Sequence, residues 1–317
     1  MTRMRAARFL WTGRLLALLL GLLAAGAGCS RHATREVVVY CAQDQTFAEP
    51  ILAEFTRQTG VRARAVFDSE AVKTVGLANR LLSEQAHPQA DVFWGNEELR
   101  TRQLAARGVF VEPDGWAAFG HRSRRLIVNT NRLALADAPP SLRALTNAAW
   151  RRKVAVAYPL FGTTATHFLA LRQAWTAPVW EAWCRALAAN EPFLVDGNSV
   201  VAKLVGRGEA WIGLTDSDDA AAEQAAGGPI AVLPLDVDAL LIPNTVGVIR
   251  NAPHPEAARQ LAAYLGGPEV VARLVAGHAL EGATLTAGEA RTLKPDWPGL
   301  LADLDAGTAR LKEVFLR

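Results

Sequence analysis

Short apolar strands alternate with amphipathic helices along this chain, and the alternation restricts the fold more than any other feature of the sequence. Residues 36–40 form a β-branched run typical of a strand covered on both faces, and residues 45–59 follow with apolar side chains at helical spacing. Residues 61–67 predict a second strand, residues 71–85 a second helix and residues 90–94 a third strand. Connections of this length imply right-handed crossovers and a mostly parallel sheet, so the sequence predicts an α/β protein.

The alternation continues through the rest of the chain. We expect strands at residues 126–129, 153–157, 210–215, 231–234 and 245–249, the last two on either side of a turn at Pro243-Asn244. We expect helices at residues 164–176, 180–189, 200–205, 255–265, 269–274 and 300–314. The sequence has no internal repeat and is long enough for one large domain or two medium lobes.

The first thirty residues have the order of a secretory signal. Basic residues precede a thirteen-residue apolar run, residues 15–27, which is too short to span about 30 Å of hydrocarbon at about 1.5 Å per residue. Small residues then lead to Cys29, as in the bacterial lipobox. We expect a signal peptide at residues 1–28, a lipid on Cys29 and a tether at residues 29–35, with an ordinary cleaved signal as the alternative. Either way, the working protein is expected in the periplasm or elsewhere outside the cytoplasm, and a lipid on Cys29 would be its one anchor to a membrane.

The composition excludes several other function classes. The chain has 34 Lys and Arg against 31 Asp and Glu, and four Arg lie in the leader, so the mature chain is nearly neutral. Because no basic run is interleaved with aromatic residues, nucleic acid is not an expected partner. Cys41 and Cys184 both lie in apolar patterns, which favours two small buried side chains over a disulfide. The six histidines do not cluster, so no zinc site is expected.

Polar side chains follow most of the expected strands. Ligands of open α/β sheets collect beyond the carboxyl ends of the strands, so such side chains predict a polar cleft. The strands end in Gln43-Asp44, Asp68-Ser69-Glu70, Asn96-Glu97, Gly162-Thr163-Thr164 and Asp216-Ser217-Asp218-Asp219.

Two segments that open helices could bind an anion. With a Thr as N-cap, the turn Gly162-Thr163-Thr164 would leave backbone N–H groups facing outward at the positive end of a helix. Asn198-Ser199 opens a second helix, and either residue could cap it. Such helix ends bind carboxylates or phosphates without a lysine. Plain helix capping is the alternative at both places.

Acidic and aromatic residues suggest a place for a cation. Asp216, Asp218 and Asp219 lie within four residues and repel one another unless a cation or a helix dipole stabilises them. Oxygen ligands of this kind suit hard cations. Trp94, at the end of a strand, could stack on a cation at the cleft mouth or lie in the core.

Several segments, taken in order, resemble one family. The segments are Tyr40-Cys-Ala-Gln-Asp44, Ala90-Asp-Val-Phe-Trp94, Leu126-Ile-Val-Asn129-Thr-Asn131, Gly213-Leu-Thr215 and Ile242-Pro-Asn-Thr245. They are similar to the extracellular solute-binding proteins of ABC importers, in particular the ferric-ion-binding group. The resemblance implies a two-lobed periplasmic-binding-protein fold of type II, in which crossing strands join two mostly parallel sheets flanked by helices. It also implies a permease and an ATPase on separate chains as partners, and no required cofactor.

The resemblance also implies a division of the chain. Residues 36–125 and 243–280 would form one lobe and residues 126–242 the other. Residues 281–317 would be a helical segment that packs on a lobe.

The resemblance implies the ligand set as well. Where the family has a His, a Glu and a Tyr-Tyr pair, this chain has Asp44, Asn96 with Glu97 beside it, and Asp218-Asp219. Asp44, Glu97, Asp218 and Asp219 are thus the implied metal ligands. Gly162-Thr163-Thr164 and Asn198-Ser199 match the family's anion-binding segments. A ferric ion with an anion, a divalent cation, and an organic cation or zwitterion such as an aminophosphonate, a polyamine or thiamine all stay open as ligands.

A secreted hydrolase that uses carboxylates is the alternative from another function class. Paired carboxylates can serve acid–base catalysis, but the sequence has no Gly-x-Ser-x-Gly motif. His167 is the one His near a hydroxyl-rich turn, and a lone helical His is more often packed than catalytic. We therefore expect a binding protein and no enzyme.

Overall fold

The computed structural model describes residues 35–68, 73–111, 115–284 and 289–316. Residues 36–317 form one compact unit, which holds every described strand and helix. The expected signal peptide, Cys29 and the tether up to residue 34 lie outside the described residues. Among the described helices, none combines the length and the apolar character needed to cross a membrane.

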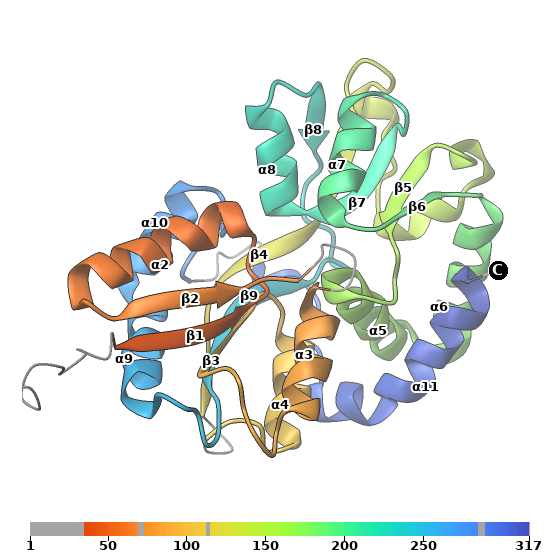
Figure 1. Ribbon diagram of the computed structural model, residues 1–317. Coiled ribbons are helices and arrows are strands. Elements are labelled where there is room, and N and C mark those ends of the chain that lie inside the picture. The colour runs from red at the N-terminus through yellow and green to blue at the C-terminus, as the bar shows by residue number, and fades with distance from the viewer. Residues whose placement is uncertain (1–34, 69–72, 112–114, 285–288, 317) are drawn as a thin grey trace, which may run out of the picture. The chain divides into compact units, whose positions relative to one another are not determined.

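One long sheet runs through this unit (Figure 1). Its path is β2-β1-β3-β9-β4-β7-β5-β6, with β8 added beside β4. The strands are β1 (Glu36–Cys41), β2 (Arg62–Val66), β3 (Val92–Gly95), β4 (Trp116–Asn129), β5 (Val154–Ala157), β6 (Phe193–Val195), β7 (Ile212–Asp216), β8 (Ile230–Val232) and β9 (Leu241–Val248).

Helices cover both ends of the sheet. They are α2 (Gln45–Thr59), α3 (Lys73–Ser83), α4 (Glu98–Ala106), α5 (Gly162–Trp175), α6 (Ala177–Ala189), α7 (Asn198–Gly206), α8 (Ser217–Ala225), α9 (Pro255–Leu265), α10 (Pro268–Ala276) and α11 (Trp297–Phe315). Short 3₁₀ turns lie at Leu135–Asp137, Leu142–Thr146, Ala148–Trp150 and Glu289–Arg291.

Two lobes meet at the strands β4 and β9. The first lobe holds the parallel strands β1, β2 and β3 with α2, α3, α4, α9 and α10, and the second holds β5 to β8 with α5 to α8. Figure 1 shows the two groups at either end of the crossing strands. The proposed limits of the lobes at residues 125/126 and 242/243 stay a prediction.

Strand β1 has the two covered faces that its β-branched run predicts. Val37 and Val39 pack on one face with residues of α2, α9 and α10, while Val38 and Tyr40 pack on the other with residues of α3. All four side chains are at most 4% exposed. Burial of apolar side chains on both faces fixes β1 in the interior of the sheet.

Strand β4 passes from one lobe into the other. Its residues from Trp116 to Ser123 pair with β9, and from Arg124 onward it pairs with β7. Because side chains alternate along a strand, Arg122 and Arg124 lie on the same face at the point where the partner strand changes. The apolar pattern of the sequence predicts a strand only at residues 126–129, whereas β4 begins at Trp116.

Pro243 and Asn244 lie inside a strand, and the expected turn there is wrong. β9 is continuous from Leu241 to Val248. In its pairing with β4, the register jumps between Phe119 and Arg122, and Gly120 takes a positive φ of 54°. Pro243 therefore lies opposite a bulge, where a strand can accept a residue that has no N–H to donate.

The C-terminal helix α11 packs on α5 and α6 and also contacts α4 of the first lobe. Its buried residues Leu304 and Phe315 join the core of the second lobe, in which the Phe315 ring lies 5.9 Å from that of Phe168. Cys41 and Cys184 are both buried, which confirms the expectation of two small buried side chains.

Phe168 provides a test of this core. It is fully buried and also contacts the Trp183 ring, at 5.4 Å between centroids. We predict that Phe168→Ala lowers the free energy of unfolding by about 3–5 kcal/mol, because it removes a large side chain from a close-packed interior. Phe193→Ala is the matched control, since Phe193 is 37% exposed. Equal losses in urea denaturation of the two variants would contradict the packing described here.

Candidate ligand-binding site

A pocket, here called the inner pocket, lies where the two lobes meet. Nine of the twelve ligand-binding residues expected from the sequence line it: Asp44, Asn96, Gly162, Thr163, Thr164, Asn198, Asp216, Asp218 and Asp219. They follow β1, β3, β5, β6 and β7 and come from both lobes. The carboxyl ends of these strands therefore converge on one pocket, as the polar strand endings suggested.

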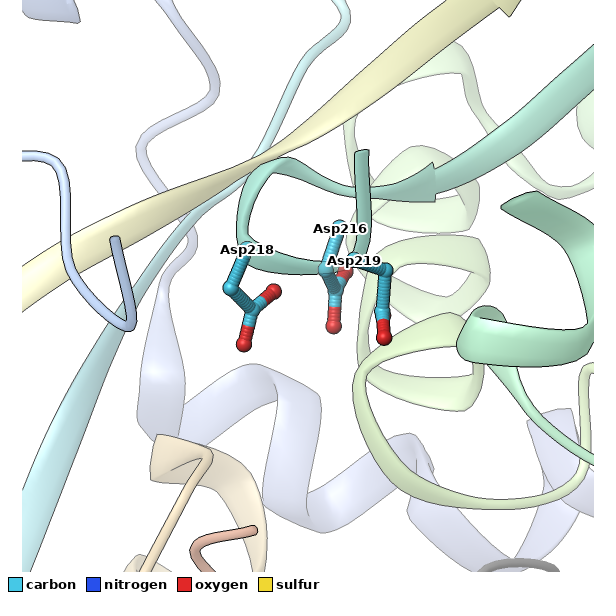
Figure 2. Close-up of side chains that lie close together, drawn as sticks. All are labelled: Asp216, Asp218 and Asp219. Atoms are coloured by element: carbon cyan, nitrogen blue, oxygen red, sulfur yellow. The ribbon is translucent and has the colours of Figure 1, made fainter. Parts of the chain in front are cut away.

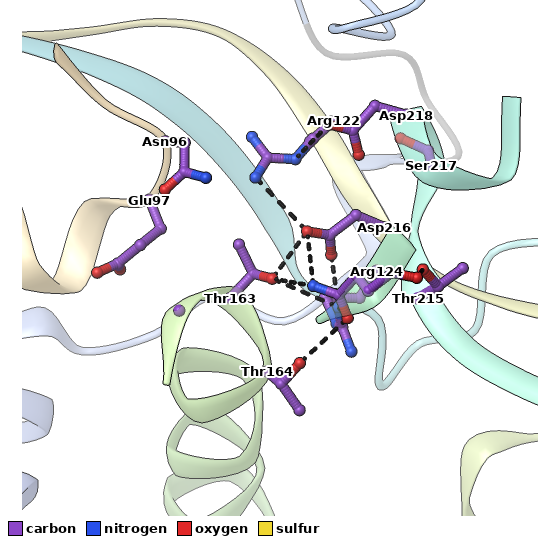
Figure 3. Close-up of polar contacts among 12 residues, drawn as sticks. Asn96, Glu97, Arg122, Arg124, Thr163, Thr164, Thr215, Asp216, Ser217 and Asp218 are labelled. Carbon is purple, nitrogen blue, oxygen red and sulfur yellow. Dashed lines mark hydrogen bonds and ion pairs between the residues drawn. The ribbon is translucent and has the colours of Figure 1, made fainter. Parts of the chain in front are cut away.

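Asp216 stands at the centre of a buried hydrogen-bond network (Figure 3). The Thr163 hydroxyl donates to Asp216 Oδ2 at 2.7 Å, and Asn198 Nδ2 donates to the same oxygen at 3.2 Å. Arg124 Nη1 donates to Asp216 Oδ1 and to Asn198 Oδ1. Burial opposes ionisation of Asp216, but the guanidinium groups of Arg124 and Arg122 outweigh it and hold the pKa of this carboxyl below its usual value.

The carboxylate of Asp218 has fewer hydrogen-bond and ion-pair partners than that of Asp216. Arg122 Nε lies 3.3 Å from Asp218 Oδ2, whereas Asp218 Oδ1 is buried and has no hydrogen-bond partner among the described residues. Burial raises the pKa of Asp218 to about 7, and the neighbouring charges of Asp216 and Asp44 add to the rise, while Arg122 opposes it. A buried acceptor without a donor favours a ligand that brings a proton or a positive charge.

Arg122 is held by acidic groups and by an amide. Its Nη2 lies 3.5 Å from Asp216 Oδ2, and its Nη1 donates to Asn244 Oδ1 at 3.3 Å. Burial would lower the pKa of the guanidinium, but the charges of Asp218 and Asp216 outweigh it and raise that pKa. Arg122 thus stays charged inside the pocket wall.

Three carboxylates of this site could ligate a cation. One oxygen each of Asp216, Asp218 and Asp219 lies within 4.8 Å of the others, as Figure 2 illustrates. Carboxylate oxygens suit hard cations. With Asp44 and Asp196, which also line the pocket, five carboxylates face the two guanidiniums of Arg122 and Arg124, so the fully ionised site has a net charge of −3. This balance favours a ligand with a positive centre.

Two helix N-termini line the pocket, with caps that differ from the expected ones. The N-cap of α5 is Phe161 and not a Thr, and the N-cap of α7 is Gly197 and not Asn198 or Ser199. Neither helix start has a hydrogen bond from a capping side chain, because Phe161 and Gly197 have no side-chain acceptor, while Thr163 and Asn198 donate to Asp216. The first N–H groups of both helices thus remain available to an anion.

Trp94, Glu97 and Ser199 do not line the inner pocket. Trp94 is fully buried in the core of the first lobe, so of the two places that the sequence leaves open for it, the core is confirmed and stacking at the cleft mouth is wrong. Apolar side chains cover the end of its strand, and a buried position of this kind is usual for a Trp. Ser199 instead lines an adjoining pocket.

Glu97 caps a helix, so its expected role as a metal ligand is wrong. Its carboxylate accepts the backbone N–H groups of Leu99 and Arg100 at the start of α4, at 2.7 and 3.0 Å. It also accepts the hydroxyl of Thr166 on α5 at 2.9 Å. Burial raises the pKa of Glu97, although these hydrogen bonds oppose the rise. In Figure 3, Glu97 points away from the Asp216 cluster.

His167 is packed, as the sequence analysis expected of a lone helical His. It is 1% exposed, and its Nε2 lies 2.7 Å from the carbonyl oxygen of Asp238. Burial and the nearby charge of Arg124 lower its pKa to about 3, so the ring is neutral.

Arg122 and Arg124 are not among the site residues predicted from the sequence. The pattern that could have indicated them is the run His121-Arg122-Ser123-Arg124-Arg125 directly before Leu126, in which two arginines recur with the strand period of two. Charged residues at such positions in a strand are unusual unless acidic partners lie opposite them.

Residues 37–277 match the family model of bacterial extracellular solute-binding proteins, and the chain belongs to this family. Its members are substrate-binding transport proteins that work outside the cytoplasm. Among curated proteins, the chain is 24% identical over 155 residues to the major ferric iron-binding protein of Neisseria meningitidis. That match covers 43% of this chain and 45% of the meningococcal protein, so it spans less than half of its relative.

Solved structures confirm the two-lobed type II periplasmic-binding-protein fold. Iron-bound HitA from Pseudomonas aeruginosa has a TM-score of 0.77 and 19% identity, and the match covers 88% of this chain and 99% of HitA. AfuA from Actinobacillus pleuropneumoniae, with fructose-6-phosphate bound, has a TM-score of 0.77 and 16% identity, over 90% of this chain and 99% of AfuA. The match to the family model confirms the resemblance to extracellular solute-binding proteins that the sequence shows.

The raised pKa of Asp218 predicts a pH effect on the ligand-free protein. The carboxyl holds its proton more tightly in the folded chain, with a pKa of about 7 against the ordinary value of 3.8. Folding stability should therefore fall as the pH rises from about 4 to about 7. Asp218→Asn removes this loss, so the variant should match the wild type near pH 4 and exceed it at pH 8 in thermal melts. Asp305→Asn, at an exposed site of α11, is the control. A constant difference across this pH range would contradict the assignment.

Proposed function

We propose that this protein captures a small polar solute in the inner pocket and delivers it to the permease and ATPase of an ABC importer. We propose a ferric ion with a companion anion as the solute. The observation that carries this proposal is the pairing of an oxygen cluster, Asp216, Asp218 and Asp219, with two uncapped helix starts across the same pocket. The named relatives, which include a ferric iron-binding protein and iron-bound HitA, support it.

The cation would bind around the carboxylate oxygen that the folded chain leaves without a donor. Asp216 already accepts hydrogen bonds from Arg124, Thr163 and Asn198. Asp218 Oδ1 accepts none from the described residues, and Asp219 and Asp44 lie beside it in the pocket wall. These three carboxylates would therefore supply most of the oxygen ligands. A hard trivalent ion prefers such oxygens.

The companion anion would bind to the first N–H groups of α5 and α7. Gly162 starts α5 with a positive φ of 53°, and no atom lies within 4 Å of where its Cβ would be. The open space and the positive helix ends suit a carboxylate, carbonate or phosphate oxygen. The anion would also neutralise part of the charge of a ferric ion.

An organic zwitterion, such as an aminophosphonate, is the second candidate. Arg122 favours it, because this guanidinium already lies 3.3 Å from Asp218 and would repel a trivalent ion. An ammonium group carries less charge and would donate to Asp218 Oδ1, while the phosphonate lies on the helix starts. The sugar phosphate bound by AfuA supports an anionic group in this fold.

We also propose that the protein works as a lipoprotein anchored through Cys29, and that it binds its ligand without chemical turnover. The order of basic, apolar and small residues before Cys29 supports the anchor. The packing of His167 supports the absence of catalysis, because burial lowers its pKa to about 3 and makes its ring a weak base.

Titration of the tryptophan fluorescence tests the ligand. We expect the purified protein to bind ferric ion supplied with carbonate, and Asp218→Asn and Asp219→Asn each to weaken that binding at least about tenfold, or about 1.4 kcal/mol. Both changes remove a charged oxygen ligand, whereas Asp305→Asn should leave affinity unchanged. Binding of 2-aminoethylphosphonate with no affinity for ferric ion would replace the first candidate by the second.

A further inference from the structure

Asn96 follows β3 directly and brings an amide from the first lobe to the inner pocket. The backbone is fixed on both sides of it. Gly95 lies so close to β9 that a Cβ on it would be 2.3 Å from Thr245 Oγ1, and Glu97 caps α4. The position from which the Asn96 side chain enters the pocket wall is therefore set by the packing of β3 and α4.

The hydroxyl of Thr74 orients the Asn96 amide. Thr74 also lines the inner pocket, lies in the first turn of α3, is 3% exposed and donates to Asn96 Oδ1 at 2.7 Å. Because a buried donor occupies the amide oxygen, the amide nitrogen is left for other partners. No described residue accepts a hydrogen bond from Asn96 Nδ2, and in Figure 3 this nitrogen points toward Arg122 and the cluster around Asp216.

Asn198, the other asparagine that lines this pocket, has both ends of its amide engaged. Its nitrogen donates to Thr163 Oγ1 at 2.9 Å and to Asp216 Oδ2 at 3.2 Å. Its oxygen accepts from Arg124 Nη1 at 2.8 Å. Of these two amides, that of Asn96 is the one whose N–H groups are available to a ligand.

The available N–H groups of Asn96 complete a set of donors that comes from both lobes. The starts of α5 and α7 present their first N–H groups from the second lobe, and neither has a capping side chain. A negative oxygen in the inner pocket could therefore accept hydrogen bonds from either side. An amide N–H group donates and does not ligate a cation, so the nitrogen of Asn96 suits an anion.

We propose that Asn96 determines specificity for the anionic part of the ligand: its Nδ2 donates to an oxygen of that anion, and Thr74 positions the amide for this contact. The anion then binds to both lobes and helps to hold the cleft closed. The inference rests on the proposed capture of a solute that has or recruits an anion. It applies to the companion anion of a ferric ion and to the phosphonate of a zwitterion alike.

Two probes test the role of Asn96 by titration of the tryptophan fluorescence: carbonate at a fixed concentration of ferric ion, and 2-aminoethylphosphonate alone. Asn96→Ala should raise the half-saturating concentration of the probe that the wild-type protein binds about tenfold, because a hydrogen bond to a charged oxygen is lost. With ferric ion, this loss should disappear at saturating carbonate. A loss of iron affinity that persists at saturating carbonate would identify Asn96 as a metal ligand and overturn the proposal.

Removal and rescue of a hydroxyl test the positioning by Thr74. Thr74→Val should weaken binding of the same probe about threefold, because the amide can then turn its oxygen toward the pocket, and Thr74→Ser should restore the wild-type affinity. Wild-type affinity of Thr74→Val, or a Thr74→Ser variant as weak as Thr74→Val, would contradict this role. Asn79→Ala, at an exposed asparagine of α3, is the matched control and should change no affinity.

The inference and the proposed function can fail separately. A wild-type protein that binds one of the probes with an affinity that Asn96→Ala leaves unchanged would overturn the inference alone. A wild-type protein that binds neither probe would overturn the proposed function and the role of Asn96 with it.

Discussion

The ion pairs between β4 and β7–α8 are the interaction on which the site depends. Arg122 and Arg124 are almost fully buried at the place where β4 leaves one lobe and enters the other. Asp216 and Asp218 face them across the strand pair. Removal of one partner from a buried pair costs roughly 3–5 kcal/mol, because the other charge is left uncompensated. The same charges therefore hold β4 to β7 and α8, and Arg122, Asp216 and Asp218 among them line the pocket.

The hydrogen-bond network around Asp216 also makes the acidic residues of the cluster chemically different from one another. In the sequence, Asp216, Asp218 and Asp219 are equivalent acids at the start of a helix. In the folded chain, Asp216 is committed to Arg124, Thr163 and Asn198, whereas Asp218 keeps one oxygen without a donor among the described residues. For the cation proposed here, selectivity would depend on the difference between these two neighbouring carboxylates and not on their number.

Much of the fold could be predicted from the sequence, because periodicity reports burial directly. The two covered faces of β1 follow from its β-branched run, and the convergence of Asp44, Asn96, Thr163 and Asp218 follows from parallel topology. The first half of β4 could not be predicted in this way, because its charged residues break the apolar pattern of a strand.

The type of a residue alone also does not show whether it binds a ligand or has a structural role. The carboxylate of Glu97 could ligate a metal, yet it caps α4. Which of these roles it has depends on the position of the backbone N–H groups that it accepts, and the sequence does not show that position. Trp94 is buried because helices cover its strand end, which no local pattern reveals. At one edge of the interlobe contact, α11 touches α4 as well as α5 and α6, and Glu97 accepts the Thr166 hydroxyl from across the gap. If the cleft opens while these contacts stay in place, this edge would be the pivot, and the opposite edge would move farthest.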